Sequence, residues 1–269
     1  MNIDRLYKFS NFFFLFIFLL ILIDSFDQHF GYWLNSNHPK IYPFTLGKPE
    51  EGWRSIVWNE NGLVESLQVI ILFVTIIILI ILLRKSSINK MNQFVKIFLL
   101  IEILGLFYFL MEEISWGQHF INFKTPNLLL RNDSILHNYQ GEFNLHNISN
   151  LFNQLPRSLV LLWCGFSILL ANILKLKNSN IFFILINPNK KLLIISFIIL
   201  IVAIPNFIVS KFNLIDYQKL HLINNTYDLK MFFTIILSFN FFRLSELHEF
   251  LFSYYFLWHT LFLKEKLLK

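Results

Sequence analysis

Six runs of predominantly apolar residues, each bounded by charged side chains, constrain this chain of 269 residues more than any other feature. A helix needs about 20 such residues to cross the hydrocarbon core of a bilayer. Only 15% of the residues are charged, whereas a soluble domain carries about 25%. The sequence therefore predicts an all-α, polytopic transmembrane bundle of about six helices. The predicted spans are Phe9–Ile23, Leu63–Leu83, Phe94–Met111, Leu159–Leu174, Leu192–Val209 and about Phe241–Leu263.

The distribution of Lys and Arg predicts the orientation of these helices, because cations are retained on the cytoplasmic side. Both termini and the connections after the second and fourth helices hold 13 of the 23 cations, with only two acids. The other three connections hold 10 cations and 14 acids. We therefore expect both termini in the cytoplasm and a multi-pass protein of a bacterial cytoplasmic (inner) membrane. The net charge of +6 reflects this topology, so we expect the lipid bilayer as partner and no nucleic acid.

The chain is expected to form a single integral membrane domain over residues 1–269. Residues 24–62 and 112–158 are predicted to be external loops that cap the bundle, because they are too short for confident separate domains and too aromatic to be disordered. Two short apolar stretches, Ile181–Ile186 and Met231–Asn240, are predicted to be interfacial helices. The single cysteine, Cys164, excludes a disulfide within the chain and a cysteine-based zinc site.

The polar residues near the membrane gather on the predicted external side. Polar side chains are expensive at membrane depth and mark functional positions there. The densest strings are EEISWGQH at 112–119 and NYQGEFNLHN at 138–147, and seven of the eight histidines fall on this side. Glu142 and His146 have i, i+4 spacing, which places them side by side in a helix. If the third helix continues past Met111, Glu112 and His119 share a face.

Carboxylates combined with histidines suit a divalent metal whose bound water attacks an ester or phosphate. Without a metal, the same groups can form a general acid and base pair. The structural alternatives are a helix-end ion pair between Arg243 and Glu246, and loop capping by His146. The predicted catalytic residues are Glu112, Glu113, Glu142 and His146, and the predicted metal ligands are Glu113, His119, Glu142, His146, Glu246 and Glu249.

Two of these strings carry a resemblance. EEISWGQ, followed about twenty residues later by Q-G-E-x-N-L-H-N, resembles a family of polytopic bacterial membrane proteins of uncharacterised activity. The resemblance covers about residues 105–147, with weaker similarity in NENGLVESLQ (59–68) and RLSELHEFLF (243–252). It implies a membrane fold and no activity, cofactor or catalytic role.

Glu102 is a separate feature, because it lies midway along the third predicted span. It is eleven residues from Glu113, so both lie on one helix face, about 16 Å apart. One interpretation is a proton or cation path that leads to the external cluster. The other is a neutral, protonated carboxyl bonded to a neighbouring helix. His259, the only histidine that is not assigned to the external side, is expected to be a hydrogen-bonding packing residue.

Three classes of function follow from these patterns. The first is a hydrolase or transferase whose external Glu/His site acts on a lipid or lipid-linked substrate. The second is a small proton- or ion-coupled transporter, against which the absence of an inverted repeat weighs. The third is a noncatalytic assembly or sensory component whose external loops bind a protein partner.

Overall fold

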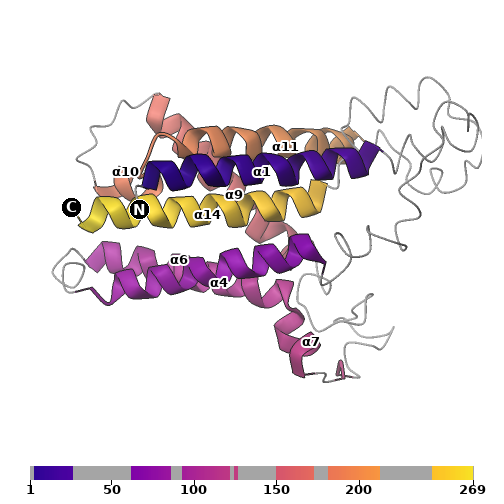
Figure 1. Cartoon of the computed structure of the whole chain (residues 1–269), viewed down its shortest axis with the longest axis horizontal. Coiled ribbons are helices and arrows are strands. Elements are labelled where there is room, and N and C mark those ends of the chain that lie inside the picture. The colour runs from indigo at the N-terminus through magenta and orange to yellow at the C-terminus, as the bar shows by residue number, and fades with distance from the viewer. Residues whose placement is uncertain are drawn as a thin grey trace, which may run out of the picture. The chain divides into compact units, whose positions relative to one another are not determined.

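The computed structural model describes residues 3–26, 62–85, 93–121, 124–126, 150–172, 181–212 and 244–268. Every regular element within these ranges is a helix (Figure 1). The elements are α1 (Ile3–Phe26), α4 (Leu63–Leu83), α6 (Gln93–Glu113), the 3-10 helix η2 (Ser115–Gly117), α7 (Gln118–Ile121), α9 (Asn150–Asn172), α10 (Ile181–Ile186), α11 (Leu192–Phe212) and α14 (Leu244–Leu268).

Four of the six predicted runs lie entirely within a helix, and the described parts of the other two, Leu159–Leu174 and Phe241–Leu263, lie within α9 and α14. The bounds of α4 agree with the prediction at both ends. The largest difference is at α9, which begins at Asn150 and includes Pro156, whereas the apolar run begins at Leu159. Within the described residues, α4 and α6 are long and apolar enough to cross a membrane, which is fewer than the six spans predicted. Shorter apolar stretches cover Leu155–Leu170 of α9 and Leu192–Ile204 of α11.

The described chain divides into two compact units, of which one comprises residues 1–66 and 198–251 and the other residues 67–197 and 252–269. In the first unit, the rings of Phe14 in α1 and Phe250 in α14 stack with their centroids 6.0 Å apart. The second unit contains all of α6, η2, α7, α9 and α10, and most of α4 and α14. It also contains the polar groups discussed below.

The residues of α6 are sorted between a buried face and an exposed face. Its buried positions follow helical spacing and include a carboxylate: Val95, Leu99, Glu102, Leu106 and Leu110. Apart from Gln93 and Gly105, the exposed positions of the same helix carry large apolar side chains: Phe94, Ile97, Leu100, Ile101, Leu104 and Phe107. The polar side chain is therefore inside and the apolar side chains are outside, which is the reverse of a soluble amphipathic helix.

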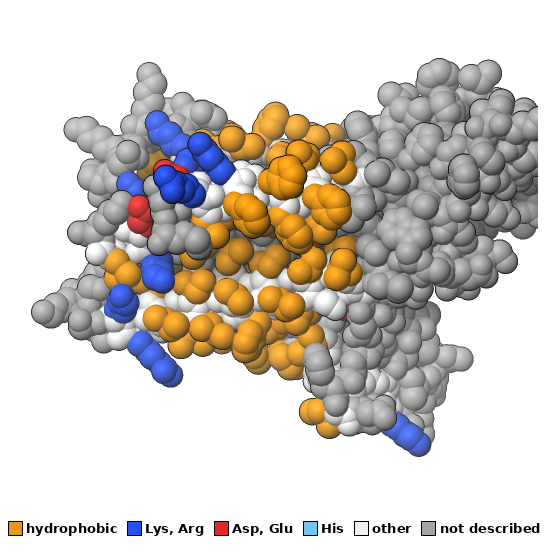
Figure 2. Space-filling model, in the orientation of Figure 1, with side chains coloured by type: hydrophobic (Ala, Val, Ile, Leu, Met, Phe, Trp, Pro, Cys, Tyr) orange, Lys and Arg blue, Asp and Glu red, His pale blue; other side chains and the backbone are white. Residues whose placement is uncertain are grey.

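The second apolar helix, α4, repeats this arrangement. Gln68 and Thr75 are buried, and the hydroxyl of Thr75 donates a hydrogen bond to the carbonyl of Ile71 at 2.7 Å. The exposed stripe of α4 contains Ile70, Phe73, Ile77 and Ile81, which are spaced at three and four residues. Figure 2 shows apolar side chains along the sides of the helices, with Lys and Arg near helix ends. Large contiguous apolar surfaces are rare on soluble monomers.

The C-terminal part of α14 is the most buried segment of the second unit. Tyr255, Trp258 and Phe262 are among the largest fully buried side chains of the described chain. The N-terminal half of α6 approaches this part of α14, because the Phe98 ring lies 6.5 Å from that of His259. Trp163 of α9 lies 5.5 Å from the same imidazole. Helices α6, α9 and α14 therefore meet around His259.

Two of the predicted interfacial segments have different outcomes. The stretch Ile181–Ile186 forms the helix α10, as expected, with Phe183, Leu185 and Ile186 buried and Phe182 exposed. Its place at a membrane interface stays a prediction. The stretch Met231–Asn240 lies outside the described residues, as do most of the two predicted external loops.

Candidate functional site

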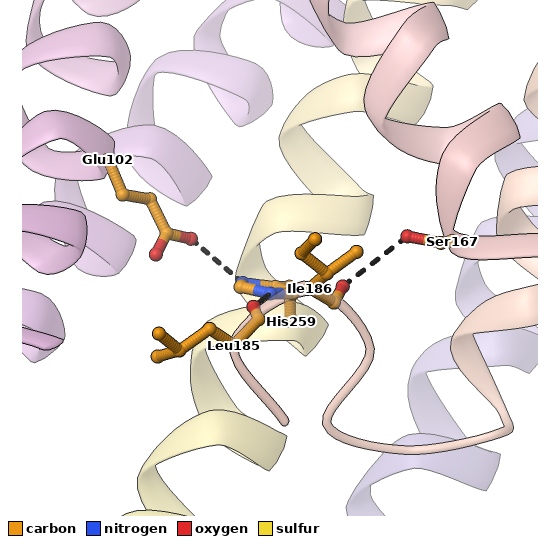
Figure 3. A network of polar contacts seen from close by, with 5 residues as sticks. All are labelled: Glu102, Ser167, Leu185, Ile186 and His259. Carbon is orange, nitrogen blue, oxygen red and sulfur yellow. Dashed lines mark hydrogen bonds and ion pairs between the residues drawn. The ribbon is translucent and has the colours of Figure 1, made fainter. Parts of the chain in front are cut away.

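A carboxylate and an imidazole meet in the interior of the second unit (Figure 3). Nδ1 of His259 lies 2.8 Å from Oε1 of Glu102, and Nε2 of the same ring lies 2.7 Å from the carbonyl oxygen of Leu185. The exposed fraction of the side chain is 0% for His259 and 2% for Glu102. Both ring nitrogens are thus engaged where water has no access, so these contacts determine where the protons lie.

The position of each group follows from its helix. Glu102 is nine residues after Gln93, and His259 is nine residues before Leu268, so each lies about 14 Å along its helix axis from that end. Glu102 is on the buried stripe of α6, and His259 is within the buried part of α14. The two side chains therefore meet near the middle of two helices although 157 residues separate them in the sequence.

Aromatic rings surround the imidazole and exclude polar neighbours from most directions. Tyr255 stacks on it with a centroid distance of 5.9 Å, and Trp163 meets it edge-on at 5.5 Å. The rings of Phe98 and Phe256 lie 6.5 Å and 6.4 Å away. The low dielectric of such a site strengthens hydrogen bonds, and for the same reason it makes an unpaired charge costly.

The two contacts of the imidazole specify how many protons the site holds. A carbonyl oxygen only accepts, so Nε2 carries a proton and donates it to Leu185. At 2.8 Å, a further proton must lie between Nδ1 of His259 and Oε1 of Glu102. That proton resides either on the carboxyl, with a neutral imidazole, or on the imidazolium, with a carboxylate. In both arrangements the pair is neutral overall and shares one transferable proton.

Some polar atoms around this pair have no hydrogen-bond partner among the described residues. They include Oε2 of Glu102, the hydroxyl of Tyr255, Oγ of Ser196 and Nε1 of Trp163. The Tyr255 hydroxyl lies near the side chains of Ser196 and Trp163, but without hydrogen-bonding geometry. A buried polar atom left unpaired costs about 1–3 kcal/mol. Such a concentration is typical of a functional site rather than a core optimised for stability.

One residue of the predicted external site that the structure describes is Glu112, the second-to-last residue of α6. Glu112 is buried, and Nε1 of Trp116 donates to its Oε1 at 2.7 Å. Next to this contact the backbone enters the left-handed region at three consecutive residues, Ser115, Trp116 and Gly117, with φ values of 46°, 54° and 84°. The helix therefore continues past Met111 to Glu113 and is then interrupted, so the condition under which His119 would share the face of Glu112 is not met.

The rest of the predicted external set is described only in part. Glu113 and Glu249 have described side chains, whereas His119 and Glu246 are placed in helices without a described side chain. Glu142 and His146 lie outside the described residues. Within the described part of the chain, no group of three or more His, Cys, Asp or Glu side chains is arranged to hold a metal ion. The metal site therefore stays a prediction.

The sequence indicated both members of the buried pair but not their contact. Glu102 was expected either to line a path or to bond to a neighbouring helix, and it does contact a neighbouring helix. A signal for the partner was present, because Glu102 lies six residues after Lys96 and His259 lies five residues before Lys264. Similar distances from cations that the sequence assigns to one membrane face predict a similar depth.

Comparison of the chain with models of protein families, with curated proteins and with solved structures finds no match.

Proposed function

We propose that this chain is a multi-pass protein of a bacterial cytoplasmic membrane and that it binds and transfers protons through Glu102 and His259, as in a small proton-coupled transporter. The observation that carries the proposal is the 2.8 Å contact between two ionisable groups that are excluded from solvent. A pair that shares one proton can release or accept it with a net change of one charge. Ionisable residues inside membrane segments commonly belong to such proton relays.

The membrane location is supported by the exposed stripes of α4 and α6. Ile101 and Leu104 of α6 are 62% and 59% exposed, while Glu102 between them is buried. Lipid is the solvent that stabilises this sorting, because it covers apolar side chains and gives no partner to a polar one. The same reasoning extends to α1, α9 and α11, which also expose apolar side chains. The sixth span, α14, and the cytoplasmic location of both termini are proposed from the apolar run and from the distribution of Lys and Arg in the sequence.

Proton binding by the pair is tested by infrared difference spectroscopy on purified protein in lipid bilayers. We expect a titration over a wide range of pH to produce a difference band of the pair, from the carboxyl of Glu102 or from the imidazolium of His259, according to which group holds the shared proton. That band should be absent from Glu102→Gln and present in Glu113→Gln, which is the matched control on the same helix. If the spectra of the wild type and Glu102→Gln are identical across this range, Glu102 does not exchange the proton and the proposal fails.

A second candidate is the external hydrolase or transferase, with a divalent metal and a lipid or lipid-linked substrate. The observation that favours it is the left-handed turn at Ser115–Gly117, which accompanies the contact between Trp116 and the buried Glu112. Backbone strain of this kind concentrates at functional sites. This candidate requires that purified protein contain a stoichiometric metal and that Glu113→Ala or His146→Ala lose it. Unchanged metal content in both variants would exclude it.

A further inference from the structure

The end of α10 depends on His259 for one of its hydrogen bonds. A helix leaves its last four carbonyl oxygens without intrahelical partners. In α10, the amide of Asn187 donates to the carbonyl of Phe183 at 2.8 Å. The carbonyl of Leu185 accepts from His259 Nε2, and the carbonyl of Ile186 accepts from the hydroxyl of Ser167 at 3.4 Å (Figure 3). Two side chains from α14 and α9 therefore hold the end of this six-residue helix.

The imidazole can form hydrogen bonds with Leu185 and Glu102 at the same time only while the shared proton is present. With that proton, Nε2 donates to the carbonyl and Nδ1 meets Glu102. Without it, the neutral ring has one hydrogen for two acceptors. A hydrogen bond to a charged group contributes about 1.5–3 kcal/mol, against about 0.5–1.5 kcal/mol for a neutral pair. The single hydrogen is therefore expected on Nδ1, facing the carboxylate, and the carbonyl of Leu185 loses its donor.

Glu102 and His259 themselves determine which ring nitrogen carries the remaining hydrogen. Among the described residues, the titratable groups around the imidazole are Glu102 from α6 and Tyr255 from α14, with Cys164 of α9 close to Tyr255. The face of Tyr255, rather than its hydroxyl, covers the imidazole, because the planes of the two rings are only 23° apart. A change of one proton at the Glu102–His259 contact is thus transmitted to Leu185 through the ring.

We propose that the Glu102–His259 pair controls α10: loss of one proton from the pair leaves the remaining ring hydrogen on Nδ1 instead of Nε2 and releases the carbonyl of Leu185. This inference rests on the proposed proton binding and adds its mechanical consequence. The pair loses one of its two protons, and the proton that stays is the one on Nδ1, so atoms and charge balance with the release of one proton and no other co-reactant. The end of α10 is joined to α11 by a short connection that contains Lys190 and Lys191. Loss of the hydrogen bond to Leu185 therefore affects the connection between these two helices.

The position of the ring hydrogen is measured directly by nitrogen NMR of the full chain labelled at histidine, in lipid bilayers. The signals of His259 are assigned by their loss in His259→Gln. We expect Nε2 to be protonated at the acidic end of a pH titration and Nδ1 to be the protonated nitrogen at its alkaline end. In Glu102→Gln the amide donates to Nδ1 at all pH values, so Nε2 should stay protonated. If Nε2 of the wild type is protonated at both ends of the titration, the inference is overturned.

Hydrogen–deuterium exchange of residues 181–187 measures the release of the helix. The ratio of wild type to Glu102→Gln at each pH removes the intrinsic pH dependence of amide exchange. We expect this ratio to rise about 2- to 10-fold from the acidic to the alkaline end of the titration, which corresponds to the loss of one neutral hydrogen bond. In Ser167→Ala, the matched control, exchange should increase at both ends of the titration and keep the pH effect.

The two experiments separate the inference from the proposed function. One outcome is an infrared difference band that depends on Glu102, with a hydrogen–deuterium exchange ratio that does not change with pH. This outcome means that the pair binds protons without controlling α10. Absence of the band overturns the proton binding and the control of α10 together.

Discussion

Replacement of His259 by Phe tests whether the buried pair contributes to stability as its geometry requires. The ring volume and much of the aromatic packing against Trp163 are retained, while both hydrogen bonds are lost. Two buried polar groups, the carbonyl of Leu185 and the carboxyl of Glu102, then have no donor or acceptor on the ring. At about 1–3 kcal/mol for each group, the free energy of unfolding should fall by about 2–6 kcal/mol.

The measurement is equilibrium unfolding of the purified protein in mixed micelles with increasing denaturing detergent. The matched control is Tyr255→Phe, one turn earlier on α14, which removes a buried hydroxyl that forms no hydrogen bond among the described residues. That control should not lower the free energy of unfolding, because it removes an unpaired buried hydroxyl whose burial costs about 1–3 kcal/mol. If His259→Phe destabilises no more than Tyr255→Phe, the two contacts of the imidazole do not contribute and the description of the pair is wrong.

Three further substitutions test other features. Ile101→Lys should raise the free energy of membrane insertion of α6 by about 3 kcal/mol in a translation assay with membranes, whereas an exposed position of a soluble protein would tolerate Lys. Gly117→Ala, at φ 84°, should lower the free energy of unfolding by about 1–2 kcal/mol in a thermal unfolding experiment. Gly105→Ala, whose new Cβ meets no atom within 4 Å, should raise it by about 0.5–1 kcal/mol. Equal effects of the two substitutions would refute the strained turn. Trp116→Phe removes the indole donor to Glu112 and should cost about 1.5–3 kcal/mol in the same unfolding measurement, and an unchanged midpoint would show that this contact is unimportant.

The positions of the helices could be predicted from the sequence, because apolar runs of this length form helices whether or not their tertiary contacts are known. The run Leu63–Leu83 coincides with α4 at both ends, since Gly62 precedes it and Arg84 and Lys85 follow it. The extension of α9 back to Asn150 was missed, because hydropathy reports only the apolar part of a helix and Pro156 argued against the rest.

The sequence predicts that a polar side chain within an apolar helix has a partner, but it does not identify the residue that is the partner. A carboxyl within an apolar helix needs a partner, and that requirement led to the expectation for Glu102. The identity of the partner depends on which helices pack together and on their rotation about their axes, and no periodicity in one helix contains this information. The left-handed turn was missed for a related reason, because Ser115 and Trp116 are not residues that favour positive φ.

The separation of 157 residues between Glu102 and His259 also sets an order of events during synthesis. At about 5–20 residues per second, a ribosome needs about 8–30 s to add His259 after Glu102 has been made. Throughout that interval α6 contains a carboxyl group without the imidazole that it contacts in the folded chain. The nascent protein must therefore keep Glu102 protonated, hydrated or bound to an assembly factor of the membrane, and completion of the pair marks the release from that transient state.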